Sequence, residues 1–410
     1  MTRFLRRMLR AFAAIAMLGC IAIVALLAFL RLEHKSTVTL PRPTGSFSVG
    51  RTIRDWTDSV ELDGLAPIPR TKRELLVWIW YPSARGQSVV ADDYLPVELR
   101  PVPDTAGRAN IWTLLTRDPA NVRGHSARDP EVSPQQRSYP VVIMRAGASA
   151  PVLNYSTLAE DLASHGYIVV GFDIPYRTGR VIFPDGRVIH RAEQNNPERC
   201  VGPDRTRMEQ CAVRVLTAWT RDIAFALDRL TQLNASDSSG RFTGRLDMTR
   251  VGVFGHSFGG AVAAQFCHDD SRCKAGIDID GAPHGSVVQD GLAQPFMFLL
   301  SDHGDASDSA SVQIERDIQS VYSRTPASRR LRVAIRGAFH FMFSDDGALL
   351  KSGVVRGVLR ALGKLRIDAR RQLAVTSYCV HTFFDHFLKG PGSSALNIAS
   401  PRYPEIQVLK

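Results

Sequence analysis

The stretch RVGVFGHSFGGAVA, residues 250–263, decides how the rest of the chain is interpreted. It holds the pattern Gly-x-Ser-x-Gly around Ser257, which chance alone would supply about 0.1 times in a chain of this length. The flanking sequence is more specific, because an apolar run precedes the serine and a run of small residues follows it. A strand that turns sharply at serine into a helix forms a nucleophile elbow. We therefore predict that Ser257 is a nucleophile.

The residues around Ser257 fit the physical demands of such an elbow. Gly255, Gly259 and Gly260 would let the helix and the neighbouring strand approach closely. The hydroxyl would stand at the N-terminus of a helix, where the backbone dipole favours negative charge. The backbone N–H of Phe258 would then donate a hydrogen bond to a developing oxyanion.

Apolar runs alternate with amphipathic stretches along most of the chain. We expect strands at 73–83, 139–147, 167–176, 250–257, 274–281, 295–302 and 331–339, and helices at 157–166, 213–234, 258–267 and 370–390. Thr157 and Glu160 are expected to form a capping box at the start of their helix. This order predicts an α/β fold with a mostly parallel central sheet and helices on both faces. We expect a single catalytic domain, residues 49–410, with polar insertions near 84–137 and 177–211.

Residues 1–35 have the composition of a membrane anchor. Four arginines lie in the first ten residues, and residues 11–30 carry no charge. A bilayer-spanning helix needs about 20 apolar residues, whereas the apolar part of a secretory signal has about 7–15. The length therefore favours an uncleaved signal-anchor, with a cleaved signal peptide as the alternative. The arginines predict a cytoplasmic N-terminus and an extracytoplasmic body, joined by a linker at 36–48.

The distribution of charge and the cysteines each limit what the chain is expected to bind or form. The formal net charge is +11, but the arginines of the body are scattered and no nucleic-acid-binding module is recognisable, so we expect no nucleic-acid partner. Cys200 with Cys211, and Cys267 with Cys273, could each close a small loop as a disulfide. Cys379 is left over and is expected to be buried on a helix.

No pattern of metal ligands is convincing. Cys267, His268 and Cys273 have no second ligand pair at zinc spacing nearby. His381 and His386 lack the i, i+4 spacing of a zinc-protease helix. We therefore predict neither a metal nor a cofactor.

A serine nucleophile needs a general base and an acid, each of which follows a strand in this kind of fold. His340 directly follows the last predicted strand and is the best candidate for the base. Asp280 and Asp302 follow the two strands after the elbow, and the residues alone do not decide between them. Asp278 is expected to be a strand-end hydrogen-bonding residue. The weaker candidates for the base are His256, His268, His284, His303, His381 and His386.

The sequence resembles the plasma-type platelet-activating-factor acetylhydrolases and related bacterial dienelactone-hydrolase-like esterases, which have the α/β-hydrolase fold. The matching pieces include YSTLAEDLASHGYIVVGFD, GHSFGG, KAGIDIDG, GAFHFMFSDD and FFDHFLKG, in the same order over most of 70–390. The resemblance implies that Asp280 is the acid and His340 the base, with Asp345 shortly after it. It does not cover 1–48, and it is loose in 84–137 and 177–211.

The second oxyanion donor departs from the pattern of that family. The family usually has His-Gly before the donor residue, whereas this chain reads MRAGASA. The resemblance places Ala146 at the histidine, Gly147 at the glycine and Ala148 at the donor. A backbone donor does not require a particular side chain, so the oxyanion hole would persist.

The resemblance implies a serine carboxylic-ester hydrolase that forms an acyl-enzyme through Ser257, His340 and Asp280. Its expected partners are short-chain acyl esters or phospholipid-like substrates, and a membrane contacted through the N-terminal helix. Two alternatives are kept: an acyltransferase on the same fold, and a non-catalytic binding protein.

Overall fold

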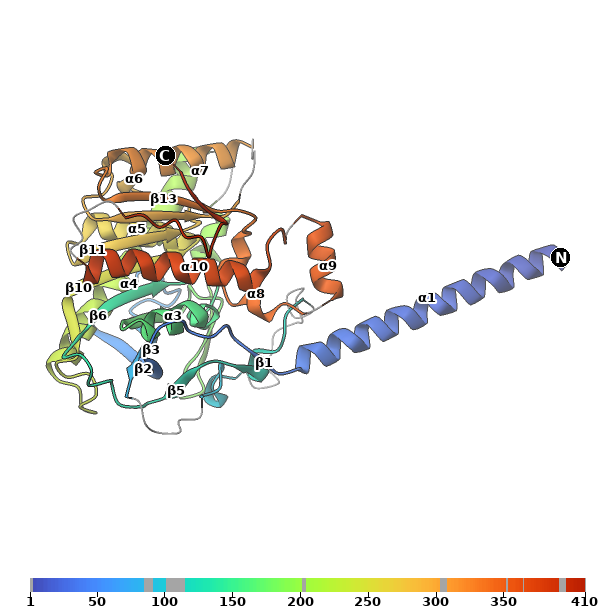
Figure 1. The fold of residues 1–410 in the computed structure, drawn as a ribbon, viewed down its shortest axis with the longest axis horizontal. Helices are drawn as coiled ribbons and strands as arrows, with labels where there is room; N and C mark the ends of the chain where they lie inside the picture. Colours follow the sequence, from blue (N-terminus) through green and yellow to red (C-terminus); the bar gives the residue numbers. More distant parts are fainter. Residues whose placement is uncertain are drawn as a thin grey trace.

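A ten-stranded sheet runs through the body of the molecule (Figure 1), in the order β14-β13-β12-β11-β10-β6-β7-β3-β2-β5. Its strands are β2 Ser48–Leu62, β3 Lys72–Ser83, β5 Ser126–Arg128, β6 Tyr139–Arg145, β7 Ile168–Asp173, β10 Leu246–His256, β11 Cys273–Ile279, β12 Phe296–Leu300, β13 Arg330–Ile335 and β14 Ile406–Val408. The six strands from β13 to β7 are parallel to their neighbours. β3 and β14 pair antiparallel at the two ends of this parallel block.

This is a computed structural model of the 410-residue chain, and it describes residues 3–84, 91–100, 115–200, 204–302, 308–351, 353–363, 365–390 and 396–409. Parts of the predicted insertions, at 85–90, 101–114 and 201–203, therefore lie outside the described residues, as does His303.

The strands of the parallel block are buried on both faces, which explains their continuous apolar sequences. On β6, Val142 and Met144 point into one half of the core, and Val141 and Ile143 point into the other. Helices α3 Ser156–Ser164, α8 Asp346–Leu349 and α10 Ala369–Phe384 cover the first face. Helices α4 Arg205–Ala235, α5 Phe258–Asp269, α6 Val287–Asp290 and α7 Ser309–Arg324 cover the second. The predicted parallel sheet with helices on both faces is confirmed.

Three strands of the sheet were not expected from the sequence. β2 is 15 residues long, pairs antiparallel with β3, and carries β5 on its other side. β5 belongs to the segment expected to be an insertion, and Val122 and Ala127 near it are buried. β14 comes from the last residues of the chain. The smaller pairs are β1 Val38–Thr39 with β4 Val122–Arg123, and β8 Arg180–Ile182 with β9 Val188–His190.

The predicted capping box at α3 is wrong. The helix follows directly from a 3-10 turn, Val152–Tyr155, so Thr157 already lies inside the helix. The carboxylate of Asp345, far along the chain, accepts the Thr157 N–H at 3.2 Å. Glu160 instead accepts the backbone N–H groups of His125 and Ser126, each at 2.9 Å. The helix end is therefore satisfied by tertiary rather than local contacts.

The segment expected to be a linker, 36–48, packs against the body. Leu40 is buried, and its N–H donates to the carbonyl of Arg123 at 2.9 Å. Thr44 donates to Asp161 of α3 through its N–H at 2.8 Å and its hydroxyl at 2.7 Å. This segment is held in place over several residues.

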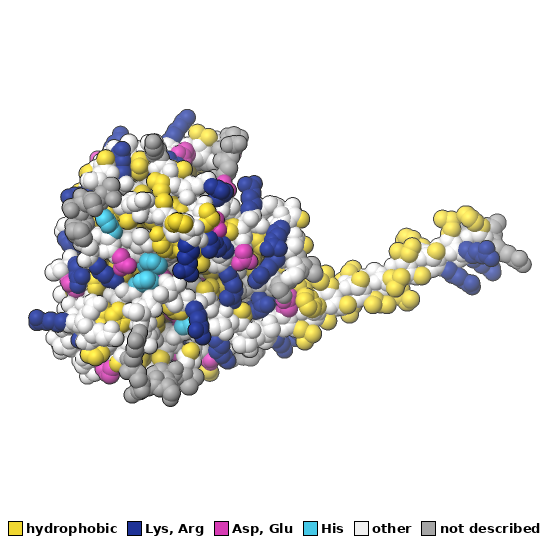
Figure 2. Space-filling model, in the orientation of Figure 1, with side chains coloured by type: hydrophobic (Ala, Val, Ile, Leu, Met, Phe, Trp, Pro, Cys, Tyr) yellow, Lys and Arg dark blue, Asp and Glu magenta, His cyan; other side chains and the backbone are white. Residues whose placement is uncertain are grey.

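Helix α1, Arg3–Lys35, projects away from the body beside α8 and α9 Val354–Ala361 (Figure 1). Its apolar side chains face outward along its length (Figure 2), and within it Arg6–Lys35 is long and apolar enough to cross a membrane. Only its last turns contact the body: Leu30 packs beside Leu350 and Leu365, and Arg117 forms an ion pair with Glu33 at 3.5 Å.

Candidate active site

Ser257 lies in a strained turn between β10 and α5. Its φ is 56° and its ψ is −128°, a conformation that L-residues adopt rarely. A Cβ on Gly255 would lie 2.1 Å from the Gly259 carbonyl oxygen, and one on Gly259 would lie 2.4 Å from the Ala146 carbonyl oxygen. Only glycine fits at these two close approaches, as the motif predicted. The strand–turn–helix context expected for the pentapeptide is present.

His340 contacts Ser257, and Asp280 contacts His340. The His340 Nε2 is 3.1 Å from the Ser257 Oγ, and the His340 Nδ1 is 2.7 Å from an oxygen of Asp280. Because a carboxylate only accepts, the Nδ1 carries the proton and the Nε2 lone pair faces the serine hydroxyl. Asp280 is also held by Ser301, whose N–H and hydroxyl each donate to it at 2.7 Å. The carboxylate is buried and fully oriented.

The other acidic candidates lie elsewhere. Asp302 accepts the N–H of Gly337 at 2.8 Å, which ties two loops together. Asp278 is fully buried and accepts the N–H of Gly281 at 2.7 Å, in agreement with the strand-end role predicted for it. Burial raises the pKa of the Asp278 carboxyl well above its ordinary value. The structure therefore brings Asp280, not Asp302, to the histidine.

Asp345, which follows His340 in the sequence, does not contact the triad in the described structure. It is fully buried, caps α3 and accepts a hydrogen bond from the Tyr94 hydroxyl at 3.2 Å. Burial raises the pKa of Asp345 to about 8. Its place is structural, between α3 and α8.

Phe258 and Ala148, whose backbone N–H groups are expected to donate to an oxyanion, lie beside Ser257. Phe258 begins α5, so its N–H has no partner within the helix. Ala148 lines the same cavity as Ser257 and Phe258. No acceptor for either N–H is found in the described part of the chain. The N–H of Gly147 is already used, because it donates to the Tyr155 hydroxyl at 3.2 Å.

The sequence dismissed His256, but the structure places its ring directly beside His340, with ring centroids 4.5 Å apart. The His256 Nε2 donates to the His340 carbonyl at 3.0 Å, so its Nδ1 accepts the Tyr155 hydroxyl hydrogen at 2.8 Å. Burial, and then the charge of His340, lower the pKa of His256 to about 3. A neutral His256 therefore connects the proposed base to the loop that carries Gly147 and Ala148.

Trp219 and Arg145 form a buried group that packs against Phe258. The Phe258 ring meets Trp219 of α4 edge-on at 5.2 Å. The guanidinium of Arg145 lies over Trp219 at 4.7 Å and over Phe172 at 4.2 Å, and donates to the Phe172 carbonyl at 2.7 Å. Burial lowers the pKa of Arg145 to about 10. This packing fixes the end of β6, from which the oxyanion loop continues.

The site opens into a cavity of about 420 Å³. Phe258, Leu300, Ile314 and Ile318 give it largely apolar walls. Pro197 and Glu198 close one side, on a segment that the Cys200–Cys211 disulfide ties to α4. The cavity suits a small or elongated apolar group next to Ser257.

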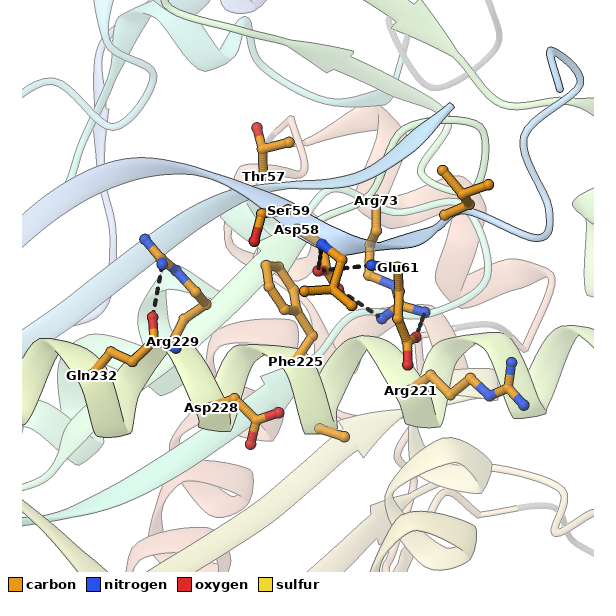
Figure 3. A pocket seen from close by; sticks show the side chains of 13 residues that line it. Thr57, Asp58, Ser59, Glu61, Arg73, Arg221, Phe225, Asp228, Arg229 and Gln232 are labelled. Carbon is orange, nitrogen blue, oxygen red and sulfur yellow. Dashed lines mark hydrogen bonds and ion pairs between the residues drawn. The ribbon is translucent and has the colours of Figure 1, made fainter. Parts of the chain in front are cut away.

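A larger cavity of about 800 Å³ lies between β2 and α4 (Figure 3), and no residue of the triad lines it. Its wall carries Arg73, which pairs with Glu61 at 3.0 Å and with Asp58 at 3.4 Å. Arg73 thus lies between two carboxylates, and none of the described residues that line this cavity is a histidine that could activate a nucleophile.

Both cysteine pairs considered from the sequence form disulfides, Cys200–Cys211 and Cys267–Cys273. Cys267 and Cys273 therefore have no free thiolates for a metal. Cys379 is unpaired and buried on α10, as expected.

Comparisons with known proteins identify the family of the chain. The sequence profile of the family described as "Platelet-activating factor acetylhydrolase, isoform II" matches residues 32–175 and 190–389. The chain belongs to this family. A "Probable 1-alkyl-2-acetylglycerophosphocholine esterase" of Arthroderma benhamiae is 26% identical over 402 residues, covering 91% of this chain and 94% of the relative. A platelet-activating factor acetylhydrolase of Cavia porcellus is 25% identical and covers 61% of this chain, which spans 58% of that relative.

Among solved structures, a ferulic acid esterase from Streptomyces cinnamoneus superposes with a TM-score of 0.71 and 26% identity. The match covers 92% of this chain and all of that one. The family resemblance and the α/β-hydrolase fold predicted from the sequence are thus confirmed. The chain is a carboxylic ester hydrolase.

Proposed function

We propose that the chain hydrolyses esters through a Ser257–His340–Asp280 triad. One observation carries this assignment: a single imidazole lies 3.1 Å from the Ser257 Oγ on one side and 2.7 Å from the buried Asp280 carboxylate on the other. A serine hydroxyl attacks only when a base accepts its proton, and this arrangement supplies the base in the required tautomer.

The reaction proceeds in two halves. His340 accepts the hydroxyl proton as Ser257 attacks the ester carbonyl, and Asp280 stabilises the imidazolium. The N–H groups of Phe258 and Ala148 hold the oxyanion of the tetrahedral intermediate. His340 then gives its proton to the leaving alcohol, and an acyl-enzyme forms. Water, activated by the same histidine, attacks the acyl-enzyme and releases the acid.

The substrate we propose is a short-chain acyl ester on a lipid-like alcohol. The Arthroderma relative is named for an alkyl-acetyl-glycerophosphocholine, which combines an acetyl ester with an apolar chain. Leu300, Ile314 and Ile318 give the cavity an apolar wall that would receive such a chain. Its volume of about 420 Å³ holds only part of a long lipid, so the remainder would extend through the cavity mouth.

We further propose that α1 is a retained membrane anchor, with the catalytic body outside the cytoplasm. A cleaved signal peptide has no need of native contacts with the mature protein. Here Leu30 packs in a small core with Leu350 and Leu365, and Glu33 pairs with Arg117. The four arginines before the apolar segment favour a cytoplasmic N-terminus.

The nucleophile is tested with Ser257→Ala in the full chain. We expect loss of p-nitrophenyl acetate hydrolysis and loss of labelling by a fluorophosphonate probe. A profile of nitrophenyl esters of increasing chain length would then test the preference for short acyl groups. Labelling of the variant at the wild-type rate would contradict the assignment of Ser257 as the nucleophile.

The acid is tested with Asp280→Asn against Asp302→Asn. Asparagine tolerates the positive φ of 56° at position 280 and keeps one oxygen to accept from Ser301. It cannot stabilise the imidazolium, so kcat should fall by on the order of 10³–10⁴. Asp302→Asn keeps an acceptor for Gly337 and should leave kcat within about twofold. Equal losses in both variants would contradict the triad.

A further inference from the structure

Two histidines and one aspartate meet where α3 packs against α10, outside the site described above. Asp161 lies on α3, His165 follows the last turn of α3, and His381 lies on α10. The two imidazole rings are stacked, with centroids 3.9 Å apart and an interplanar angle of 20°. Figure 2 shows histidine and acidic side chains side by side on the face that α10 crosses in Figure 1.

The residue types suit metal ligands. Metal ions bind ionised carboxylates and neutral imidazoles, and this cluster offers one carboxylate and two imidazoles.

We propose that Asp161, His165 and His381 bind a divalent transition-metal ion of the zinc class. Asp161 Oδ2 is 2.9 Å from His381 Nδ1 and 3.9 Å from His165 Nε2, and the three ligand atoms all lie within 4.8 Å of one another. Ligand atoms around tetrahedral zinc are roughly 3.5 Å apart. Small side-chain rotations would bring the three atoms to that spacing. The ion would take the place of the hydrogen between His381 and Asp161, and the His381 ring would then carry its proton on Nε2.

Imidazole and carboxylate ligands together favour zinc, copper or nickel over calcium and magnesium, which prefer sites made of oxygen alone. The histidine side chains are 21% and 14% exposed, so a water molecule can complete the coordination from the solvent side.

Neighbouring residues would orient the ligands. Thr44 donates to Asp161 Oδ1 through its N–H and its hydroxyl, which leaves Oδ2 for the ion. The same hydroxyl oxygen lies 2.9 Å from His165 Nε2, and the ion would replace this contact. Once Nε2 of His165 binds metal, its Nδ1 carries the proton, and Asp385 lies 3.9 Å from that atom. Carboxylate–histidine–metal chains of this kind are common in zinc proteins. Lys389 pairs with the other oxygen of Asp385 at 2.9 Å, which neutralises much of its own charge.

The site lies outside the proposed triad, and its occupancy is independent of ester hydrolysis. Because Thr44 belongs to the segment that follows α1, the ion would join this segment to α3 and α10. Bound metal would therefore stabilise the attachment of the body to its membrane segment.

The proposal is tested by zinc titration of the chelator-treated full chain in detergent, without reductant so that the disulfides stay intact. Calorimetry should show one zinc ion per chain. Zinc should also raise the Tm. His165→Asn and His381→Asn each remove a metal ligand and should weaken zinc binding at least about 100-fold. Asp385→Asn removes only the charge beside a ligand and should weaken it about tenfold.

His268→Asn is the matched control. His268 is also flanked by carboxylates, Asp269 at 3.9 Å and Asp290 at 3.5 Å, but belongs to no such cluster among the described residues. It should bind zinc like the wild type. The proposal is overturned if the wild type binds no zinc at 100 µM, on the order of the weakest useful affinity, or if His268→Asn weakens binding as much as His165→Asn. Esterase activity of His165→Asn should stay near that of the wild type, so failure here leaves the triad untouched.

Discussion

Tyr155 connects two parts of the site that lie about 100 residues apart in the chain. Its oxygen accepts the Gly147 N–H, and its hydroxyl hydrogen goes to the Nδ1 of His256, which in turn holds the His340 carbonyl. Tyr155→Phe leaves two buried polar groups unpaired, which costs about 1–3 kcal/mol of stability. Because the oxyanion loop and the base both lose an anchor, kcat should fall about tenfold with KM unchanged.

Tyr81→Phe is the control for this prediction. Tyr81 is equally buried, and its hydroxyl donates to the Pro130 carbonyl at 2.7 Å, away from the site. It should lose similar stability and keep its kcat. If both variants show the same kcat, Tyr155 contributes only to folding.

The residues of the site differ in how far the sequence alone could predict them. The prediction of Ser257, and of Phe258 as the residue after it, follows from the strand–turn–helix pattern, and that of His340 follows from its place directly after the last predicted strand. Asp280 and Asp302 follow equivalent strands, so choosing between them needed the family resemblance. His256 was set aside because its position in the motif says nothing of the tertiary partners, Tyr155 and the His340 carbonyl, that define its role.

At the scale of elements, the contact between α5 and the end of β6 would shape the proposed oxyanion hole. A Cβ on Gly259 would lie 2.4 Å from the Ala146 oxygen and 2.6 Å from the Arg145 oxygen, and backbone atoms cannot move aside easily. Gly259→Ala should therefore displace the loop that carries Ala148. We expect a loss of about 1–3 kcal/mol in stability and, because one oxyanion donor is displaced, a fall in kcat of about 10²-fold or more.

Gly357→Ala provides the contrast, since a Cβ there meets nothing within 4 Å on the exposed helix α9. Alanine should leave kcat unchanged and stabilise the chain by up to about 1 kcal/mol. Thermal unfolding and nitrophenyl-ester kinetics on both variants check the pair. A fully active Gly259→Ala would mean that the close approach does not position the hole.

Elements with strong local patterns were predictable, and those defined by pairing were not. The parallel strands have continuous apolar runs because both faces are buried. β2, next to the edge strand, has a mixed pattern of buried and exposed residues, and the edge strand β5 is only three residues long. Pairing with neighbouring strands therefore decides the structure of both. The Asp161–His165–His381 cluster could not be predicted for a similar reason. Asp161 and His165 lie four residues apart, but only the packing of α10 on α3 brings His381 to them.

For the whole molecule, Asp345 should make stability depend on pH. Its folded pKa of about 8 exceeds the unfolded value near 4, so the folded chain holds a proton that the unfolded chain releases. Stability is then lost as pH rises towards 8. His256 has the opposite effect on the pH dependence, because its folded pKa of about 3 lies below the unfolded value. It makes stability rise as pH increases to about 6.5, and it adds little further change above that pH. Between pH 6.5 and 8 the contribution of Asp345 should be a loss of about 2 kcal/mol.

Asp345→Asn isolates this contribution. Asparagine keeps an acceptor for the Thr157 N–H but does not titrate. Unfolding midpoints measured at pH 6.5 and 8 should differ for the wild type and agree more closely for the variant. An undiminished difference in the variant would assign the pH dependence to other groups.

The contacts between α1 and the body affect both the stability of the body and its retention at the membrane. Arg117 donates to the Leu350 carbonyl at 2.7 Å and to the Ser36 hydroxyl at 3.1 Å while pairing with Glu33, so one side chain joins the end of α1 to the core beneath α8. If α1 is retained, mass spectrometry should find residues 1–35 in the mature chain, and the chain should stay with membranes after alkaline carbonate washing.

Removing 1–35 should release an active body, destabilised by about 1–3 kcal/mol because Arg117 loses its carboxylate partner. Arg117→Met in the full chain should lose comparable stability while staying in the membrane, which separates the packing role of this contact from anchoring. A mature chain that begins after residue 35 would show instead that α1 is a cleaved signal.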